Sequence, residues 1–171
     1  MKRSSLADRY CSIARASAEL VDGWTFVILR ELFLGNRRFD GLQAQTGMSP
    51  RSLTLRLKSL LDDGILHQIP VPGNARRKEY RMTEKGLDLW PMIIMLKQWG
   101  DKWQGPWDDD SSPLSVVHRG TDHELDVGVI CKECGEPVDA HSGVSHVSLP
   151  MSAERVEMAR THAQNITKTK K

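Results

Sequence analysis

The sequence contains little cysteine and lacks a long apolar run. Three cysteines among 171 residues are too few, and an odd number, for a disulfide scaffold, so we expect a reducing compartment. The longest candidate for a membrane span, residues 92–96, is far shorter than the roughly 18 apolar residues that a spanning helix needs. The basic start, residues 1–5, precedes no apolar stretch of the kind found in secretory signals. We therefore expect a cytoplasmic protein with no membrane partner.

Motifs of catalysis are also missing. The sequence has no glycine-rich phosphate loop, no nucleophile elbow and no paired catalytic carboxylates. Cys131 and Cys134 form a Cys-x-x-Cys pair, the one motif here that could carry thiol–disulfide chemistry. In redox proteins such a pair normally lies at the start of a helix. Here residues 135–137, Gly-Glu-Pro, break a helix rather than begin one. We expect that the protein is not an enzyme.

The net charge of +2 hides an uneven distribution. Residues 35–86 carry ten Lys and Arg against five Asp and Glu, whereas residues 87–171 carry nine against thirteen. A basic middle and an acidic remainder indicate an anionic partner that touches one part of the molecule. Because such a split also arises by chance, the motifs have to decide between the two explanations.

Apolar spacing and turn residues predict a mainly helical fold with a small β hairpin. The predicted helices cover residues 6–20, 24–34, 39–46, 50–63 and 87–103, and the predicted strands cover residues 65–69 and 78–82. Ser49 is placed to cap the fourth helix, with Pro50 at its first position. This order of elements is that of a winged helix-turn-helix, in which the second helix enters the major groove of DNA.

The predicted helix over residues 50–63 is amphipathic. At about 100° per residue its leucines at positions 53, 57, 60 and 61 share an inner arc. The outer arc and its flanks carry hydroxyl and cationic groups of the kinds that contact bases and phosphates, and one apolar residue suited to a thymine methyl group. A merely solvated helix face is the alternative. The predicted DNA contacts on this face are Arg51, Ser52, Thr54, Leu55 and Lys58.

Three adjacent cations, Arg76, Arg77 and Lys78, lie at the tip of the predicted hairpin. Because these side chains repel one another, a phosphate backbone that relieves the repulsion through counterion release is a favourable partner. The cationic tip and the capped helix together favour DNA binding over simple solvation of the helix face.

Several stretches of the chain form a combined signature. They are residues 11–16, 22–25 with 28–32, 35–42, 49–53 with 56–58, 64–66 and 79–86. This signature resembles that of the HxlR-type winged helix-turn-helix regulators, which are related to the multiple-antibiotic-resistance type, and it extends over residues 10–103. The resemblance implies a bacterial, cytoplasmic transcription regulator. It also implies that the five residues named on the outer helix face read the major groove and that Arg76 and Arg77 serve the wing.

The resemblance further implies that the N-terminal helix and the helix over residues 87–103 form a homodimer. The second helix has independent support, because Trp99 and Trp103 are an i, i+4 aromatic pair on a helix rich in apolar residues. A symmetric partner would bury the apolar surface that one small core leaves uncovered. Completion of the monomer's own core is the alternative. The expected dimer contacts are Leu6, Tyr10, Ile94, Trp99 and Trp103.

The chain divides into four segments. We predict a winged helix-turn-helix and dimerisation domain over residues 1–107 and an acidic linker over residues 108–113. Short alternating apolar stretches predict a small β-rich extension over residues 114–150, which contains the Cys-x-x-Cys pair. A short helix and a disordered basic tail are expected over residues 151–171. The fold class is therefore mainly α with a small β wing and a C-terminal β-rich extension.

The extension contains a candidate zinc site. A Cys-x-x-Cys turn supplies two of the four ligands that a tetrahedral ion needs, and histidines upstream can supply the others. In family members with this extension a Cys tends to precede Gly-His near this point, whereas this chain has Thr-Asp-His at residues 121–123, which weakens a Cys-rich site. The candidate ligands are His118, His123, Cys131 and Cys134, with His141 and His146 as further choices.

Cys11 stands where the resembling family keeps a cysteine near the N-terminus, and some members use that thiol to sense oxidants or electrophiles. Arg9 and Arg15 are close in sequence and would stabilise a thiolate. A structural cysteine beside Tyr10 and Ile13 is the alternative, because Cys is among the most buried residue types. Cys11 is therefore a redox candidate.

These features predict a sequence-specific DNA-binding transcription regulator. The residues do not distinguish a repressor from an activator, but the family resemblance implies a dimeric repressor that occludes promoter DNA and responds to an unidentified signal, with Cys11 as the candidate sensor of oxidants or electrophiles. Its expected partner is double-stranded DNA with a pseudo-palindromic operator, because a two-fold axis relates the two recognition helices of a dimer. The alternative is a winged-helix protein–protein interaction module without sequence-specific DNA binding. Binding to DNA through several phosphates would weaken steeply as salt rises, which discriminates the two functions.

Overall fold

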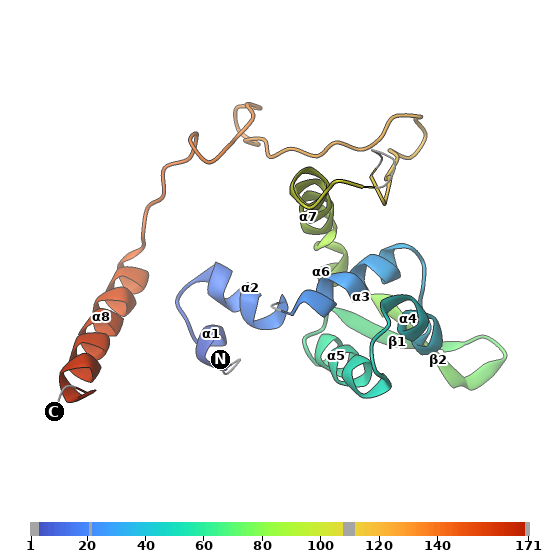
Figure 1. Ribbon diagram of the computed structural model, residues 1–171, viewed down its shortest axis with the longest axis horizontal. Coiled ribbons are helices and arrows are strands. Elements are labelled where there is room, and N and C mark those ends of the chain that lie inside the picture. The colour runs from blue at the N-terminus through green and yellow to red at the C-terminus, as the bar shows by residue number, and fades with distance from the viewer. Residues whose placement is uncertain (1–3, 21, 108–111, 170–171) are drawn as a thin grey trace. The chain divides into compact units, whose positions relative to one another are not determined.

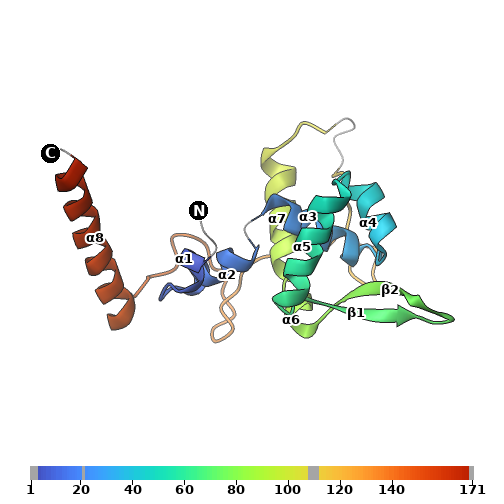
Figure 2. The same ribbon diagram turned by 90° about the horizontal axis from the view of Figure 1, so that it is seen from below.

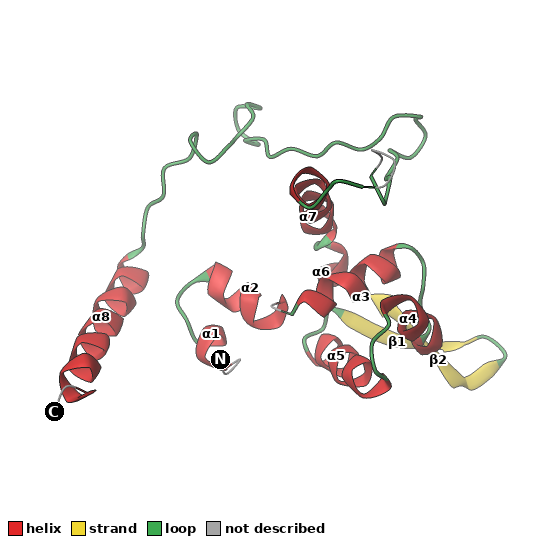
Figure 3. Ribbon diagram, in the orientation of Figure 1, coloured by secondary structure: helices red, strands yellow, loops and turns green. Residues whose placement is uncertain are grey.

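The computed structural model describes residues 4–20, 22–107 and 112–169, and the chain forms two compact units. One unit comprises residues 26–143, and the other joins residues 1–25 to residues 144–171. Figure 1 labels the elements of both units in chain order, and Figure 3 separates helices, strands and loops. Residues 108–111 of the predicted acidic linker lie outside the described ranges.

Three helices build the centre of the larger unit: α3 (Gly23–Phe33), which begins in the smaller unit, α4 (Phe39–Thr46) and α5 (Pro50–Asp62). Their sequences repeat apolar side chains at helical spacing, so each helix presents one apolar face to the others. This packing confirms the predicted helix-turn-helix core. The side chains buried there are Ile28, Leu29, Leu32, Leu42, Met48, Leu53, Leu57 and Leu60.

The turn between α4 and α5 is set by local chemistry. Gly47 ends α4 with φ of 69°, a left-handed conformation that glycine adopts without a steric cost, and its N–H donates to the carbonyl of Gln43 at 3.0 Å. Ser49 then caps α5, because its Oγ accepts from the backbone N–H of Ser52 at 3.2 Å. Pro50 occupies the first turn, where a missing N–H costs nothing. The predicted start of α5 is confirmed.

Two antiparallel strands, β1 (Leu66–Val71) and β2 (Asn74–Met82), form the wing. The ladder pairs Leu66 with Met82 and continues in register to Pro70 with Lys78. The next pair is Val71 with Asn74, so residues 75–77 form a bulge on β2 that has no counterpart on β1. Figure 1 and Figure 2 both show the hairpin extending away from the helices of this unit. The strands are longer than predicted, because pairing continues beyond Pro70 into the turn.

Two further helices follow the wing: α6 (Glu84–Leu87) and α7 (Trp90–Trp103). Thr83 caps α6 by accepting from the N–H of Gly86 at 3.2 Å, and its hydroxyl also donates to the carbonyl of Gly64 at 2.7 Å. The helix predicted over residues 87–103 begins later than expected: α6 ends at Leu87, and α7 begins at Trp90 with Pro91 in its first turn, where proline is tolerated.

The segment over residues 112–143 is mainly irregular, as Figure 3 shows. A β-rich extension is not confirmed: the described residues contain only two isolated bridges here, Val117 with Glu124 and Ile130 with Pro137. The apolar stretches are too short to build a ladder, and each bridge closes a tight turn. The segment is instead tied to α7, where Ser112 Oγ donates to Asp101 at 3.0 Å and the N–H of Val127 donates to Gln98 at 3.3 Å.

The smaller unit contains α1 (Ser4–Ala7), α2 (Ser12–Leu20) and α8 (Leu149–Thr169). The predicted helix over residues 6–20 is interrupted where the Arg15 side chain bonds the carbonyl of Arg9 at 2.6 Å. Helix α8 covers residues for which the sequence predicted a short helix and a disordered tail. Its sequence is rich in Ala, Glu, Arg and Met, all strong helix formers, and has no glycine. None of the helices in the described ranges is long and apolar enough to cross a membrane.

Candidate nucleic-acid interface

Helix α5 has an inner and an outer face of opposite character. Leu53, Leu57 and Leu60 are at most 1% exposed and fix the rotation of the helix about its axis. The same rotation turns the predicted DNA contacts outward, and Leu55 is 61% exposed. All five predicted residues of this face are exposed together: Arg51, Ser52, Thr54, Leu55 and Lys58. The face thus offers cations, hydroxyls and one apolar side chain, which is the chemistry that contacts phosphates, base edges and thymine methyl groups.

The two hydroxyl groups of this face are held in place by the first turn of α5. Thr54 Oγ1 donates to the carbonyl of Pro50 at 2.8 Å, and Ser49 Oγ donates to Ser52 Oγ at 2.9 Å. A hydroxyl oxygen with one such bond still has acceptor capacity. These bonds fix the direction in which Ser52 and Thr54 present their oxygens beside Arg51.

The wing presents its cations near its tip. The Arg77 and Lys78 side chains are exposed, and Lys78 belongs to the last regular ladder pair before the bulge. The backbone of Arg76 lies in the bulge, whereas its side chain lies outside the described part of the structure. Arg81, nearer the base of the wing, is paired with Glu79 at 3.0 Å and is less suited to a phosphate.

The sequence interpretation did not select two further exposed cations, one of which is bonded to the wing through its backbone. Arg37 and Arg38 are exposed immediately before α4, and the carbonyl of Arg37 accepts from the N–H of Tyr80 on β2 at 2.8 Å. This bond joins the start of the helix-turn-helix to the wing. The signal for both residues was present in the sequence, since they contribute to the positive charge of residues 35–86.

Comparison with known sequences identifies the family to which the chain belongs. Residues 19–108, more than half of the chain, match the profile of the HxlR-like helix-turn-helix family. The chain belongs to the HxlR-like helix-turn-helix family. An HTH-type transcriptional regulator of Mycobacterium tuberculosis (strain H37Rv) is 36% identical over 135 residues, which cover 77% of this chain and 82% of the relative. A Synechocystis HTH-type transcriptional regulator is 36% identical over 94 residues, covering 54% of this chain and 70% of the relative.

Solved structures place the HxlR-like chain with the same class. The crystal structure of PA1607, described as a transcription factor, superimposes with a TM-score of 0.75 at 29% identity and covers 85% of this chain and 99% of that one. A second transcription-factor structure, from Pseudomonas aeruginosa, has a TM-score of 0.54 at 23% identity and covers 84% of this chain and 96% of that one. The first likeness supports DNA-binding regulation as the function of the class, and the second supports the winged-helix fold.

The residues that the sequence assigned to an HxlR-like dimer differ in exposure. On α7, Trp99 and Trp103 are 55% and 62% exposed, which suits a partner surface. Ile94 does not suit a dimer contact, because it is 2% exposed and belongs to the core of its own unit. In the smaller unit Tyr10 is exposed and Leu6 is half-buried.

Cys11 lies at the start of α2, where its carbonyl accepts from the N–H of Arg15 at 3.0 Å. The thiol is free and half-buried, and Cys11 lines a pocket of about 520 Å³ together with Arg15 and His146. Arg9, one of the two cations expected to assist a thiolate, is instead paired with Glu154 of α8 at 3.4 Å. The Arg15 side chain lines the same pocket, with its Nε donating to the carbonyl of Arg9 at 2.6 Å.

The four predicted zinc ligands are not brought together. His118 and His123 stack with ring centroids 5.5 Å apart, and the backbone N–H groups of Cys134 and then Glu133 lower the pKa of the Cys131 thiol. Each pair sits on its own bridged turn. Within the described ranges, no three His, Cys, Asp or Glu side chains gather at one point. Zinc at this extension is therefore not supported.

Proposed function

We propose that this HxlR-like protein binds a specific DNA operator through α5 and the wing. The observation that carries the proposal is the outer face of α5, where Arg51, Leu55 and Lys58 are exposed together on a helix whose rotation is fixed by buried leucines. A helix that presents such a face after a tight turn fits the major groove of DNA. Arg51 and Lys58 are the proposed base-reading cations, with Ser52, Thr54 and Leu55 beside them.

The wing supplies contacts to the DNA backbone in this proposal. Arg77 and Lys78 are exposed near the tip, and the adjacent Arg76 belongs to the same cluster by sequence. Phosphate contacts position a protein on the duplex and carry no base information. We include Arg37 here, because its backbone bond to Tyr80 joins it to the wing.

The proposed mode of action is repression by a homodimer in the cytoplasm, where promoter DNA is accessible. The support is the exposed Trp99 and Trp103 pair on α7, a large apolar surface at the end of the family domain. A two-fold dimer places two copies of α5 on successive major grooves, so the operator is a pseudo-palindrome whose half-sites lie about one helical turn apart. Occupation of such a site in a promoter blocks the polymerase.

We further propose that Cys11 makes the regulator responsive to oxidants or electrophiles. The support is a free, half-buried cysteine beside the N-terminus of α2, in a pocket that Arg15 and His146 also line and that a small reagent can enter. The test is DNA binding before and after mild oxidation, with Cys11→Ser as the matched variant. An equal response of the two proteins would overturn this role of the thiol.

Selection of bound fragments from a random DNA pool tests the proposed function. The selected operator is then titrated with protein between about 50 and 200 mM salt, where binding through several phosphates weakens steeply. We expect Arg51→Ala to change base preference, and Arg77→Ala to weaken all sequences alike and to lower the salt slope by about one.

Arg119→Ala is the control, because Arg119 is an exposed cation of the irregular segment outside the family match. We expect this variant to bind the operator as the native protein does. Failure to enrich any sequence would favour the alternative of a winged-helix protein–protein interaction module. If Arg119→Ala lowered operator affinity as much as Arg77→Ala, binding would depend on the net charge of the protein and not on the position of the wing cations.

A further inference from the structure

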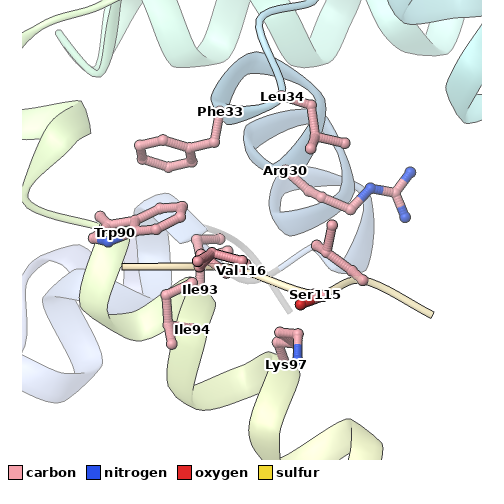
Figure 4. Close-up of a pocket in the computed structure, with 11 residues that line it drawn as sticks. Arg30, Phe33, Leu34, Trp90, Ile93, Ile94, Lys97, Ser115 and Val116 are labelled. Atoms are coloured by element: carbon pink, nitrogen blue, oxygen red, sulfur yellow. The ribbon is translucent and has the colours of Figure 1, made fainter. Parts of the chain in front are cut away.

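The larger unit contains a pocket that the DNA-binding face does not use. Its volume is about 260 Å³, and it lies between α3, α7 and residues 114–117. The rings of Phe33 and Trp90 pack in a tilted arrangement at one end, with centroids 4.8 Å apart and an interplanar angle of 54°. Figure 4 shows these two rings together, with Val116 and Ile93 beside them. The family match ends at residue 108, so one wall of this pocket comes from outside it.

The two cations in the lining, Arg30 and Lys97, are already compensated. Arg30 pairs with the buried carboxylate of Glu31 at 2.8 Å, and its guanidinium points away from the two rings in Figure 4. Lys97 pairs with Asp101 at 2.7 Å and with Glu124 at 3.4 Å. The charge of each cation is balanced by at least one carboxylate, so an anionic ligand would meet no uncompensated positive charge here. The walls therefore favour a ligand without charge.

The remaining features define the ligand by size and polarity. Drug-sized pockets measure about 300–1,000 Å³, so this pocket suits a smaller compound of one or two fused rings. Aromatic rings pack favourably on the edges and faces of Phe33 and Trp90. Lys97 has a third ammonium hydrogen beyond its two ion pairs, and Ser115 contributes a hydroxyl, so one oxygen on the ligand would find a donor.

We propose that this pocket binds an uncharged aromatic compound of one or two rings that bears a single hydroxyl or carbonyl oxygen. In a second step, which rests on the DNA-binding function proposed above, the compound is the effector of the regulator. Helix α3 belongs to the core of the helix-turn-helix, whereas α7 carries the proposed dimer surface. A ligand between them changes how the DNA-reading part is held relative to the dimer partner.

Isothermal titration calorimetry of the full chain without DNA tests the site, with 2-naphthol as the probe. We expect one molecule bound per chain, and binding of 2-naphthoate that is weaker by at least about tenfold, which corresponds to roughly 1.4 kcal/mol. No heat with 2-naphthol would overturn the site. Equal or tighter binding of 2-naphthoate would overturn the choice of an uncharged ligand.

Val116→Phe places a ring in the pocket, and we expect it to lower 2-naphthol affinity by at least about tenfold. Val129→Phe is the matched control, since Val129 belongs to the same irregular segment but is exposed outside the lining. Ser115→Phe is a second blocking variant at an exposed position of the lining, where a larger side chain does not disturb the core. Native affinity in both blocking variants would place the ligand elsewhere.

The effector step is measured separately, as operator affinity with and without 2-naphthol. We expect operator affinity to change in the native protein and to stay constant in Val116→Phe. Calorimetric binding without any change in operator affinity would overturn the effector step while the site remains. A protein that selects no operator but binds 2-naphthol would overturn the proposed function and not the site.

Discussion

Leu53 and Leu55 are neighbours on α5 with opposite surroundings, 0% and 61% exposed. We expect Leu53→Ala to lower the free energy of unfolding by about 2–5 kcal/mol, because it leaves a cavity in the core. Leu55→Ala should change this free energy by at most about 0.5 kcal/mol. It should instead reduce affinity for the selected operator. Urea denaturation followed by circular dichroism measures the first effect, and equal destabilisation by both variants would contradict the assigned faces.

Asp101 on α7 is held ionised by its partners. Partial burial alone raises its pKa, but hydrogen bonds from Lys97 and Ser112 and the charge of Lys97 together bring the pKa below the ordinary value of 3.8. Because the pKa is lower in the folded state, the stabilisation is present at neutral pH and is lost as the pH falls through the folded pKa. The bond between Ser112 and Asp101, one of the attachments of the irregular segment to α7, is therefore expected to persist until the pH falls below the ordinary carboxyl pKa.

Replacement of Lys97 by Met should raise the pKa of Asp101, since the burial stays while the ammonium is lost. Carboxyl carbon NMR over an acid titration measures this pKa directly. Asp139 is the internal control, because its pKa is lowered by the Ser142 hydroxyl and by the N–H groups of His141 and Ser142. A Lys97→Met variant that shifts neither carboxyl group would show that Ser112 alone stabilises the Asp101 carboxylate.

At the scale of elements, the buried Gly86 packs α6 tightly against the backbone of Ile65. A Cβ atom there would collide with the carbonyl oxygen of Ile65, whereas a Cβ at Gly100 in α7 meets nothing within 4 Å. We expect Gly86→Ala to destabilise by about 1–3 kcal/mol through overpacking. Gly100→Ala should stabilise by up to about 1 kcal/mol, because alanine is the better helix former. Thermal unfolding compares the two, and equal melting temperatures would refute the close contact.

Elements with local signals were the ones that the sequence predicted well. The start of α5 is set by Ser49 and Pro50, its buried face is set by the leucine spacing, and the turn before it is set by Gly47. All of these signals lie in or beside the helix itself. The length of β2 was not predictable in this way, because strand pairing depends on residues distant in sequence. The separate turn α6 before Trp90 was also not predictable locally, because the Thr83 hydroxyl that caps it also bonds the carbonyl of Gly64, 19 residues earlier in the chain.

The same distinction holds for the candidate sites. Exposure of Arg51 and Lys58 follows from the helical repeat alone, so their face was predictable. Whether Cys131 meets a histidine depends on how an irregular segment turns, and periodicity carries no information about this. The pocket beside Trp90 was also missed, since its walls come from segments more than 50 residues apart.

At the scale of the whole molecule, the exposed tryptophans of α7 predict the oligomeric state. Light scattering at micromolar concentration should give twice the chain mass of 19.3 kDa. Trp99→Glu should give a monomer, because a buried unpaired charge at a dimer interface is costly. Val129→Glu, on an exposed side chain outside α7, should leave the dimer intact. A native protein of monomer mass would rule out the proposed dimer.

The bulge on β2 lies beyond the regular ladder that holds the wing to the rest of the unit, so the length of the wing tip does not depend on that ladder. Residues 75–77 have no partners on β1, whereas the ladder from Leu66–Met82 to Pro70–Lys78 is regular. Insertion or deletion of a residue within the bulge therefore leaves that ladder, and the bond from Tyr80 to Arg37, in place. Wing length is thus a variable that evolution or protein engineering can change without altering α5. If the wing and α5 contact DNA as proposed above, bulges of different length would change the reach of the wing and leave the contact face of α5 unchanged.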